Sequence, residues 1–163
     1  MGFQNKAWES GFELVISFEV VNPGQGSYRR PYIAVFVEDT HGKPVRTLEL
    51  WYQRGRGVRW LRNLRSWYRG EVSRMQRDGG DLASTMSGPT RQPGTYSVIW
   101  DGKNDAGKVV EQGDYVVVLE VVREHGTYQL ERKTLALTNK PVKVDLLENA
   151  ELKHGTIEFR KKR

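Results

Sequence analysis

Short segments in which apolar and polar residues alternate run along most of the chain, separated by clusters of turn-forming residues. Phe12–Val20 is the clearest, because every second residue is large and apolar. A two-residue period is typical of a β-strand with one buried face. Similar patterns predict further strands at 31–38, 45–52, 95–100, 115–122, 127–137, 142–146 and 151–159. Eight or so short strands with turn-rich connections predict an all-β fold, an immunoglobulin-like antiparallel β-sandwich.

Two of the predicted strands, 31–38 and 115–122, are rich in apolar residues on both faces, which indicates that they lie at sheet centres. The chain of 163 residues is long enough for one well-buried core. Its sequence contains no repeat and no linker that would separate two such cores. We therefore expect a single domain over residues 1–163.

The two-residue period gives way to a helical one after Gly57. Five large apolar residues share an arc of about 120° on a helical wheel, namely Trp60, Leu61, Leu64, Trp67 and Tyr68. Four arginines occupy the opposite side, namely Arg59, Arg62, Arg65 and Arg69. This pattern predicts an inserted amphipathic helix over about 58–69, with its aromatic side on the sandwich. Residues from about 70 to 94 are rich in Gly, Ser, Thr, Asp and Pro and predict a long loop.

The net charge of +6 is concentrated in one segment. Between Arg54 and Arg77 there are eight arginines and a single acidic residue, Glu71. Local basicity of this kind indicates a specific anionic partner or surface. Because guanidinium groups suit carboxylates and phosphates, the arginine side of the helix is a candidate surface for a protein partner, a phosphate group or an anionic membrane. A solvated helix side without a partner is the alternative interpretation.

Cysteine is absent from the chain, which excludes disulfides, thiolate metal sites and cysteine nucleophiles. No apolar run reaches the roughly 18 to 20 residues of a transmembrane helix, so we expect no membrane-spanning segment. The start, Met1–Gln4, does not have the form of a signal peptide.

The sequence contains no recognisable catalytic motif. There is no Gly-x-Ser-x-Gly elbow, no phosphate-binding loop and no dinucleotide fingerprint. We therefore expect a protein that is not an enzyme, while a site assembled only in three dimensions stays possible.

The three histidines, His41, His125 and His154, are far apart in the sequence and do not have the spacing of metal ligands. Asp101, Asn104 and Asp105 do not match a calcium-binding loop either, and turn formation accounts for them. We expect no metal site.

Two resemblances to known families are visible. The segment from Tyr96 to Glu120, with residues 96–108 followed by Gly113-Asp-Tyr-Val, resembles the Trp-Asp-Gly…Gly-x-Tyr hairpin of flagellar hook-capping-type immunoglobulin-like domains. That hairpin is common in extracytoplasmic β-sandwiches and indicates fold more than function.

The second resemblance covers most of the chain. It rests on ordered segments at 30–39, 45–51, 60–67, 87–94 and 122–128. They resemble an uncharacterised family of bacterial periplasmic proteins whose members usually sit beside PepSY-type membrane proteins and periplasmic flavin transferases. The resemblance implies a periplasmic location, with the leader absent from this sequence, and an accessory or binding role in a membrane-associated redox or iron-uptake system. This location also argues against a nucleic-acid partner.

The flavin-transferase context directs attention to Thr90. Ser87-Gly-Pro-Thr90 is similar to the acceptor motif Asp-Gly-x-Ser/Thr-Gly-Ala-Thr, in which FMN is joined to the last threonine. The chain departs from this motif at two positions, Ser84 and Pro89. The main expectation is therefore a protein without a cofactor, and the alternative is a covalent FMN carrier modified at Thr90. Glu124 and His125 belong to the family pattern and are further candidates for a functional role.

Overall fold

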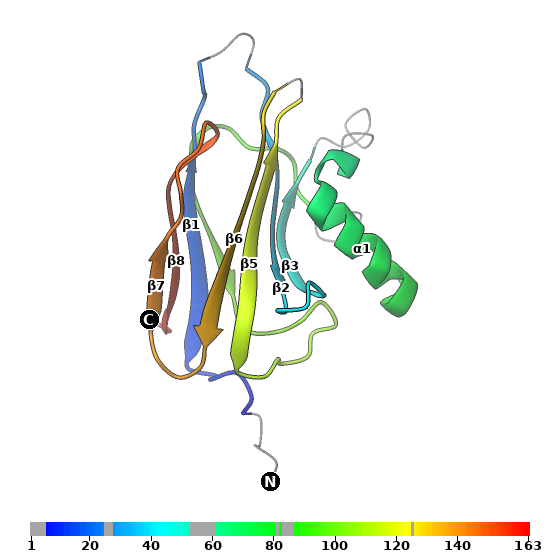
Figure 1. The fold of residues 1–163 in the computed structure, drawn as a ribbon. Coiled ribbons are helices and arrows are strands. Elements are labelled where there is room, and N and C mark those ends of the chain that lie inside the picture. Colours follow the sequence, from blue (N-terminus) through cyan, green and yellow to red (C-terminus); the bar gives the residue numbers. More distant parts are fainter. Residues whose placement is uncertain (1–5, 25–27, 53–60, 81, 83–86, 125) are drawn as a thin grey trace.

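The computed structural model describes residues 6–24, 28–52, 61–80, 82, 87–124 and 126–163. In these residues, two four-stranded sheets face each other and one helix lies outside them (Figure 1). The strands are β1 (Phe12–Val20), β2 (Tyr32–Glu38), β3 (Pro44–Trp51), β4 (Gly94–Trp100), β5 (Gly113–Val122), β6 (Tyr128–Leu137), β7 (Val142–Asp145) and β8 (Leu152–Lys161), and the helix is α1 (Arg65–Asp78). The predicted all-β sandwich with one inserted helix is confirmed.

The strand orders are β4-β1-β8-β7 in one sheet and β3-β2-β5-β6 in the other, and every named pair is antiparallel. The inner faces of both sheets form the main core, in which the largest fully buried side chains include Phe18, Trp51, Trp100 and Phe159. The two strands expected at sheet centres, β2 and β5, are indeed inner strands, because each has a hydrogen-bonded neighbour on both sides.

Strand β2 is buried along its whole length and on both faces. Ile33, Val35 and Val37 point into the core between the sheets. Tyr32 and Phe36 point to the outer face, where they belong to a second apolar cluster under α1. Both faces of β2 are therefore covered, which explains why its sequence lacks the polar alternation of β1.

The predicted bounds of the helix and the loop are wrong. Residues 61–63 form a single 3₁₀ turn and α1 continues to Asp78, so residues 70–78, nine of the fourteen in the helix, lie in the segment predicted as a loop. The predicted helix ended at about residue 69, just before Gly70, a residue of low helix propensity. In the structure a Cβ atom at position 70 would lie 3.1 Å from Cγ of Pro44, so the glycine lets the helix pass close to the start of β3.

Helix α1 is capped at its C-terminal end by Gly79. Gly79 has a φ of 75°, and its N–H donates a hydrogen bond to the carbonyl of Met75 at 2.8 Å. A glycine in this left-handed region is a common way to terminate a helix. Residues 58–60, which include Arg59 and Trp60, lie outside the described residues.

The Trp-Asp-Gly turn after β4 closes one end of the main core. The indole of Trp100 is fully buried and donates its N–H to the carbonyl of Lys103 at 2.8 Å. Its ring packs edge-on against Trp8, with centroids 4.7 Å apart, and against Tyr115, with centroids 5.5 Å apart. Gly102 has a φ of 82°, and a Cβ atom there would lie 2.2 Å from Cδ2 of Trp8. The motif therefore has a packing role in this chain.

We predict that Gly102→Ala lowers the free energy of unfolding by about 2–6 kcal/mol, because it adds left-handed strain and a clash with the Trp8 ring. Gly107→Ala is the matched control, since Gly107 has a φ of 81° but a methyl group added there would have no atom within 4 Å. The control should lose only the strain, about 1–2 kcal/mol. Urea denaturation of both variants gives the comparison, and equal losses would contradict the packing role.

Candidate functional site

Helix α1 lies against the outer face of the sheet β3-β2-β5-β6 (Figure 1). Leu61 and Leu64, from the turn before the helix, and Trp67, from its first turn, are at most 8% exposed. They belong to one apolar cluster with Tyr32, Ala34, Phe36, Leu50, Tyr52 and Val118 of the sheet. Each fully buried side chain of this size contributes about 1.5–3 kcal/mol. The predicted apolar side of the helix thus faces the sandwich, for the residues that are described.

The sheet supplies the cap of the helix. Leu64 at the N-cap makes no capping hydrogen bond, and the first turn of α1 has no acidic residue. Instead the carboxylate of Glu120, on β5, accepts the backbone N–H groups of Ser66 and Trp67, each at 2.8 Å. Glu120 is fully buried. A carboxylate in this position satisfies two of the unpaired N–H groups and interacts favourably with the helix dipole.

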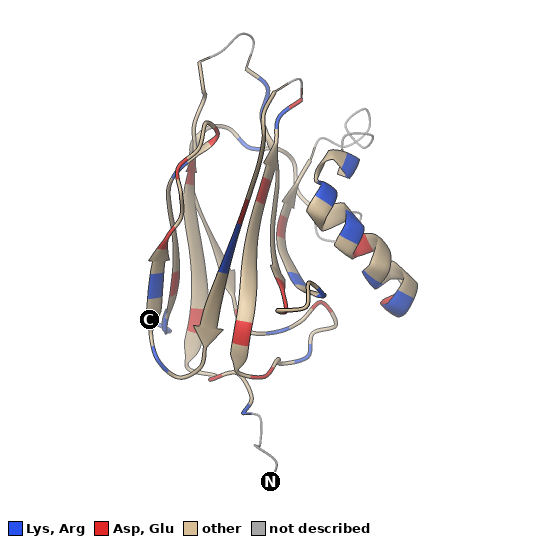
Figure 2. Cartoon of the chain, in the orientation of Figure 1, with Lys and Arg blue, Asp and Glu red and all other residues tan. Residues whose placement is uncertain are grey.

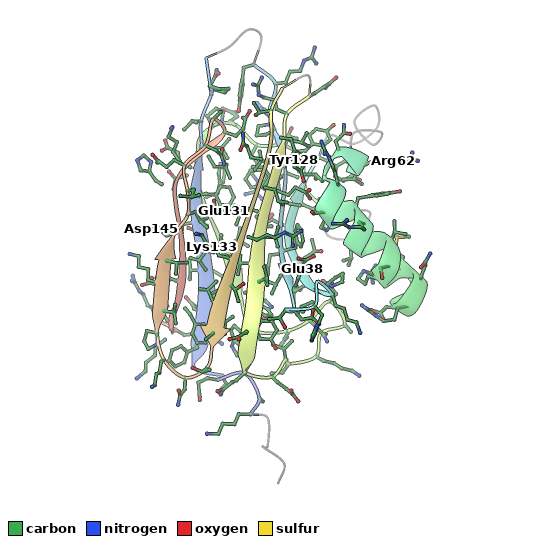
Figure 3. All side chains as sticks on the ribbon, in the orientation of Figure 1. Glu38, Arg62, Tyr128, Glu131, Lys133 and Asp145 are labelled. Atoms are coloured by element: carbon green, nitrogen blue, oxygen red, sulfur yellow. The ribbon has the colours of Figure 1, made fainter. Side chains whose placement is uncertain are left out.

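Tyr128, at the start of β6, joins this cap. Its hydroxyl donates a hydrogen bond to the carboxylate of Glu120. The guanidinium of Arg65 lies over the Tyr128 ring, with Cζ 4.3 Å from the ring centroid. Burial, together with the hydrogen bond to Glu120, raises the pKa of Tyr128 to about 12. Figure 3 shows Tyr128 and Glu38 on the side of the sandwich that faces α1.

A third sheet contact holds the same end of the helix. Arg132 on β6 forms an ion pair with Glu38 at the end of β2. A second nitrogen of the same guanidinium donates to the hydroxyl of Ser66 at 3.0 Å. Because Glu38 is nearly buried, at 6% exposed, its charge needs such a partner. The first turn of α1 is therefore tied to three strands, β2, β5 and β6.

The second half of α1 contains a buried ion pair. Nε of Arg74 lies 2.5 Å from the Glu71 carboxylate, and the two residues are 6% and 4% exposed. Arg74 also donates to the carbonyls of Gly79 and Gly80, both at 3.1 Å, and Glu71 accepts the N–H of Leu82 at 2.8 Å. Arg74 therefore does not add to the exposed basic surface suggested by the arginine count. The sequence does contain a sign of this ion pair, because residues three positions apart, such as Glu71 and Arg74, are neighbours on a helix.

The arginines predicted to face solvent do so where they are described. Arg62, Arg65 and Arg69 have exposed side chains, and Arg59 lies outside the described residues. We call Arg62, Arg65 and Arg69 the arginine face. Figure 2 shows the basic residues spread along α1. Within the part of the chain that is described, neither Arg62 nor Arg69 forms an ion pair, whereas Arg77 is paired with Asp78 at 3.1 Å.

Thr90, the candidate FMN acceptor, lies just before β4 and is partly buried. On one side of it, the N–H of Gly88 donates to the carbonyl of Leu50 at 2.8 Å. On the other side, the guanidinium of Arg91 lies 4.7 Å from the ring centroid of Trp51. The backbone at Gly88 is thus paired with β3, and the side chain of Arg91 packs on the same strand, so the segment that contains Thr90 is held to β3 on both sides.

The Arg-Glu-His-Gly turn between β5 and β6 has a buried ion pair. Nε of Arg123 lies 2.8 Å from the carboxylate of Glu151, and the two side chains are 7% and 0% exposed. A Cβ atom at Gly126 would lie 2.8 Å from Cζ of Arg123, which accounts for the glycine. Glu124 is 3.6 Å from the guanidinium of Arg29. The described part of this turn therefore packs the end of the sandwich.

The other titratable candidates lie on separate turns and strands. His41 is exposed in the turn before β3, and His125 lies outside the described residues. His154 on β8 is exposed, has a φ of 53°, and holds its Nδ1 2.7 Å from the carboxylate of Glu19. Within the ranges that the structure covers, no three His, Asp or Glu side chains are grouped so that they could hold a metal ion.

The acidic turn after β4 uses its side chains to bind its own backbone and that of β3. The Asp101 carboxylate accepts the N–H of Lys103 at 3.2 Å, and the amide oxygen of Asn104 accepts two further backbone N–H groups of the turn at 3.0 Å. Asp105 accepts the N–H of Thr47 at 2.9 Å, and burial raises the pKa of this carboxyl. Turn bonding accounts for Asp101 and Asn104, whereas Asp105 joins the turn to β3.

Comparison with known proteins gives one match. A family model described as a predicted periplasmic protein (DUF2271) matches residues 13–154. Its description confirms the expected periplasmic location. No curated protein and no solved structure matches the chain. Among the described residues, the helical segments are all too short or too polar to cross a bilayer.

We predict that the hydrogen bond from Tyr128 to Glu120 stabilises the fold at neutral pH and stops doing so at high pH. Because the folded-state pKa of Tyr128 is raised to about 12, its contribution is fully present below the unfolded pKa of about 10 and is lost as the pH rises through about 12. The difference in unfolding free energy between the wild type and Tyr128→Phe should therefore shrink over this window. Urea denaturation at stepped pH measures it, and a difference that stays constant to pH 12 would contradict the assignment.

Proposed function

Because the chain belongs to the DUF2271 family of predicted periplasmic proteins, we propose that it is a non-catalytic binding protein that presents its arginine face to an acidic protein partner. The observation that carries the proposal is the charge of Arg62 and Arg69, which no described residue compensates. Arg62 lies in the 3₁₀ turn before α1 and Arg69 on α1, and both segments are packed on the sandwich. A fixed helix holds its guanidinium groups in place before binding, which lowers the entropic cost of recognition. We further propose that this partner belongs to a membrane-associated redox or iron-uptake system, because of the family resemblance described above.

An acidic protein is favoured over an anionic membrane. Interfacial helices insert an apolar side into the lipid, but Leu61, Leu64 and Trp67 are buried against the sheet. Val72 and Met75 are the large apolar side chains that α1 exposes, at 38% and 40%. Without an inserted apolar side, membrane attachment would depend on about 1 kcal/mol for each basic residue. Carboxylates of a protein partner can instead accept paired hydrogen bonds from each guanidinium.

We predict that reversing the arginine face, Arg62→Glu with Arg65→Glu and Arg69→Glu, weakens binding to a polyglutamate peptide about a hundredfold or more, because like charges then oppose each other. Binding of the wild type should also weaken with added salt. Stability should change by about 0.5 kcal/mol for each exposed arginine and up to about 1 kcal/mol for Arg65, which loses its contact with Tyr128. Fluorescence anisotropy and urea denaturation measure the two quantities.

The matched control reverses three exposed lysines on the other side of the sandwich, Lys140, Lys143 and Lys161, and so makes the same change in net charge. Peptide binding should remain within about twofold in this control. Equal losses in both triple variants would show that only net charge matters. Binding to anionic vesicles but not to the peptide would overturn the protein partner in favour of the membrane.

The second candidate is a covalent FMN carrier, supported by the partly exposed Thr90 beside the cation of Arg91. In the reaction, Oγ of Thr90 would attack the phosphorus of an activated flavin nucleotide, the hydroxyl proton would be released and the activating group would leave. Co-expression with a periplasmic flavin transferase should then add the mass of one FMN, and Thr90→Ala should abolish the gain. Thr95→Ala, an exposed threonine on β4, is the control and should be modified. An unmodified wild-type protein rules out the carrier.

A further inference from the structure

A groove of about 390 Å³ runs between α1 and the turn that joins β2 to β3. Its lining consists of Glu38, Gly42, Lys43, Pro44, Ser66, Arg69, Gly70, Ser73 and Arg132. The helix contributes Ser66, Arg69, Gly70 and Ser73, which share one side because they are three or four positions apart. Three of these four residues are small, and this leaves the hollow beside the helix. The volume is typical of a site for a small ligand.

The groove carries excess positive charge. Arg132 is engaged by Glu38, so this pair is internally compensated. Lys43 and Arg69 are exposed and form no ion pair with any residue in the described ranges. They line the groove from two different elements, the β2–β3 turn and α1, and Ser73 adds a hydroxyl from the helix side, whereas the hydroxyl of Ser66 is already engaged by Arg132. Two cations that no described carboxylate compensates and the hydroxyl of Ser73 therefore line one hollow.

We propose that this groove binds the phosphate group of a small phosphate monoester. Such a group carries a charge of about −1.5 to −2 at pH 7, which matches the two uncompensated cations. The guanidinium of Arg69 can donate two parallel hydrogen bonds to phosphate oxygens, and the ammonium of Lys43 adds a compact charge from the opposite side. The lining contains no aromatic side chain, so the groove recognises the phosphate and not a stacked ring.

This site goes beyond the proposed binding of an acidic protein. Arg69 belongs both to the groove and to the arginine face, Lys43 lines only the groove, and Arg62 belongs only to the arginine face. Variants at Lys43 and Arg62 therefore separate the two proposals. Lys43→Gln should weaken phosphate binding and leave polyglutamate binding unchanged, and Arg62→Gln should do the reverse.

Calorimetric titration at constant ionic strength, with inorganic phosphate and glycerol 3-phosphate as the probes, tests the site. Both probes should bind at one saturable site, and Lys43→Gln or Arg69→Gln should each weaken binding about tenfold or more. Arg77→Gln is the matched control, because Arg77 is exposed on the same helix outside the groove, and it should stay within about twofold. Ser73→Leu keeps every charge but fills part of the groove, and it should also abolish binding.

Several results would overturn the proposal. Absence of saturable binding removes the site, and equal weakening in Arg77→Gln reduces it to a diffuse electrostatic field. Unchanged binding in Ser73→Leu has the same meaning, because that variant alters shape and not charge. If inorganic phosphate binds and glycerol 3-phosphate does not, the groove is a site for the free ion and not for a phosphate monoester. Equal affinity for succinate removes the preference for phosphate monoesters.

Discussion

Burial of both faces of β2 is the constraint on which the rest of the structure depends. The opposite sheet covers Ile33, Val35 and Val37, and among the described residues α1 and the turn before it cover Tyr32 and Phe36 on the outer face. Without the helix, an aromatic surface in the middle of a sheet would be open to solvent, where such patches promote association. The insertion between β3 and β4 is therefore part of the core and not an appendage, and its outer side becomes a surface of fixed position.

Polar contacts then determine the orientation of that surface. The apolar cluster holds α1 against the sheet, but apolar packing alone is not directional. The carboxylate of Glu120 fixes the first turn through two backbone N–H groups, and the guanidinium of Arg132 bridges Glu38 to Ser66. These contacts come from strands that are buried or hydrogen-bonded along their length. The cations of α1 therefore project from a rigid support, which suits recognition without large rearrangement.

Sequence reasoning recovered what depends on neighbours in the chain. The strands follow from a two-residue period, and the exposure of Arg62, Arg65 and Arg69 follows from a helical one. The predictions from sequence were wrong where a contact with another segment determines the structure. Gly70 lies inside the helix, where Pro44 leaves little room for a side chain. Arg74 is buried because it pairs with Glu71 and donates to the carbonyls of Gly79 and Gly80. The groove was not predicted, since Lys43 and Arg132 reach α1 only through the pairing of β2 with β3 and of β5 with β6.

The close approach of Gly70 to Pro44 has a consequence for how such a protein can diversify. A Cβ atom at position 70 would lie 3.1 Å from Cγ of Pro44. The absence of a side chain at Gly70 therefore allows the short separation between the helix axis and the hairpin. Alanine at this position would push the two elements apart by a few tenths of an ångström, and a larger residue would act as a wedge. Members of the family could thus adjust the width of the opening, and the size of what enters it, without exchanging either cation.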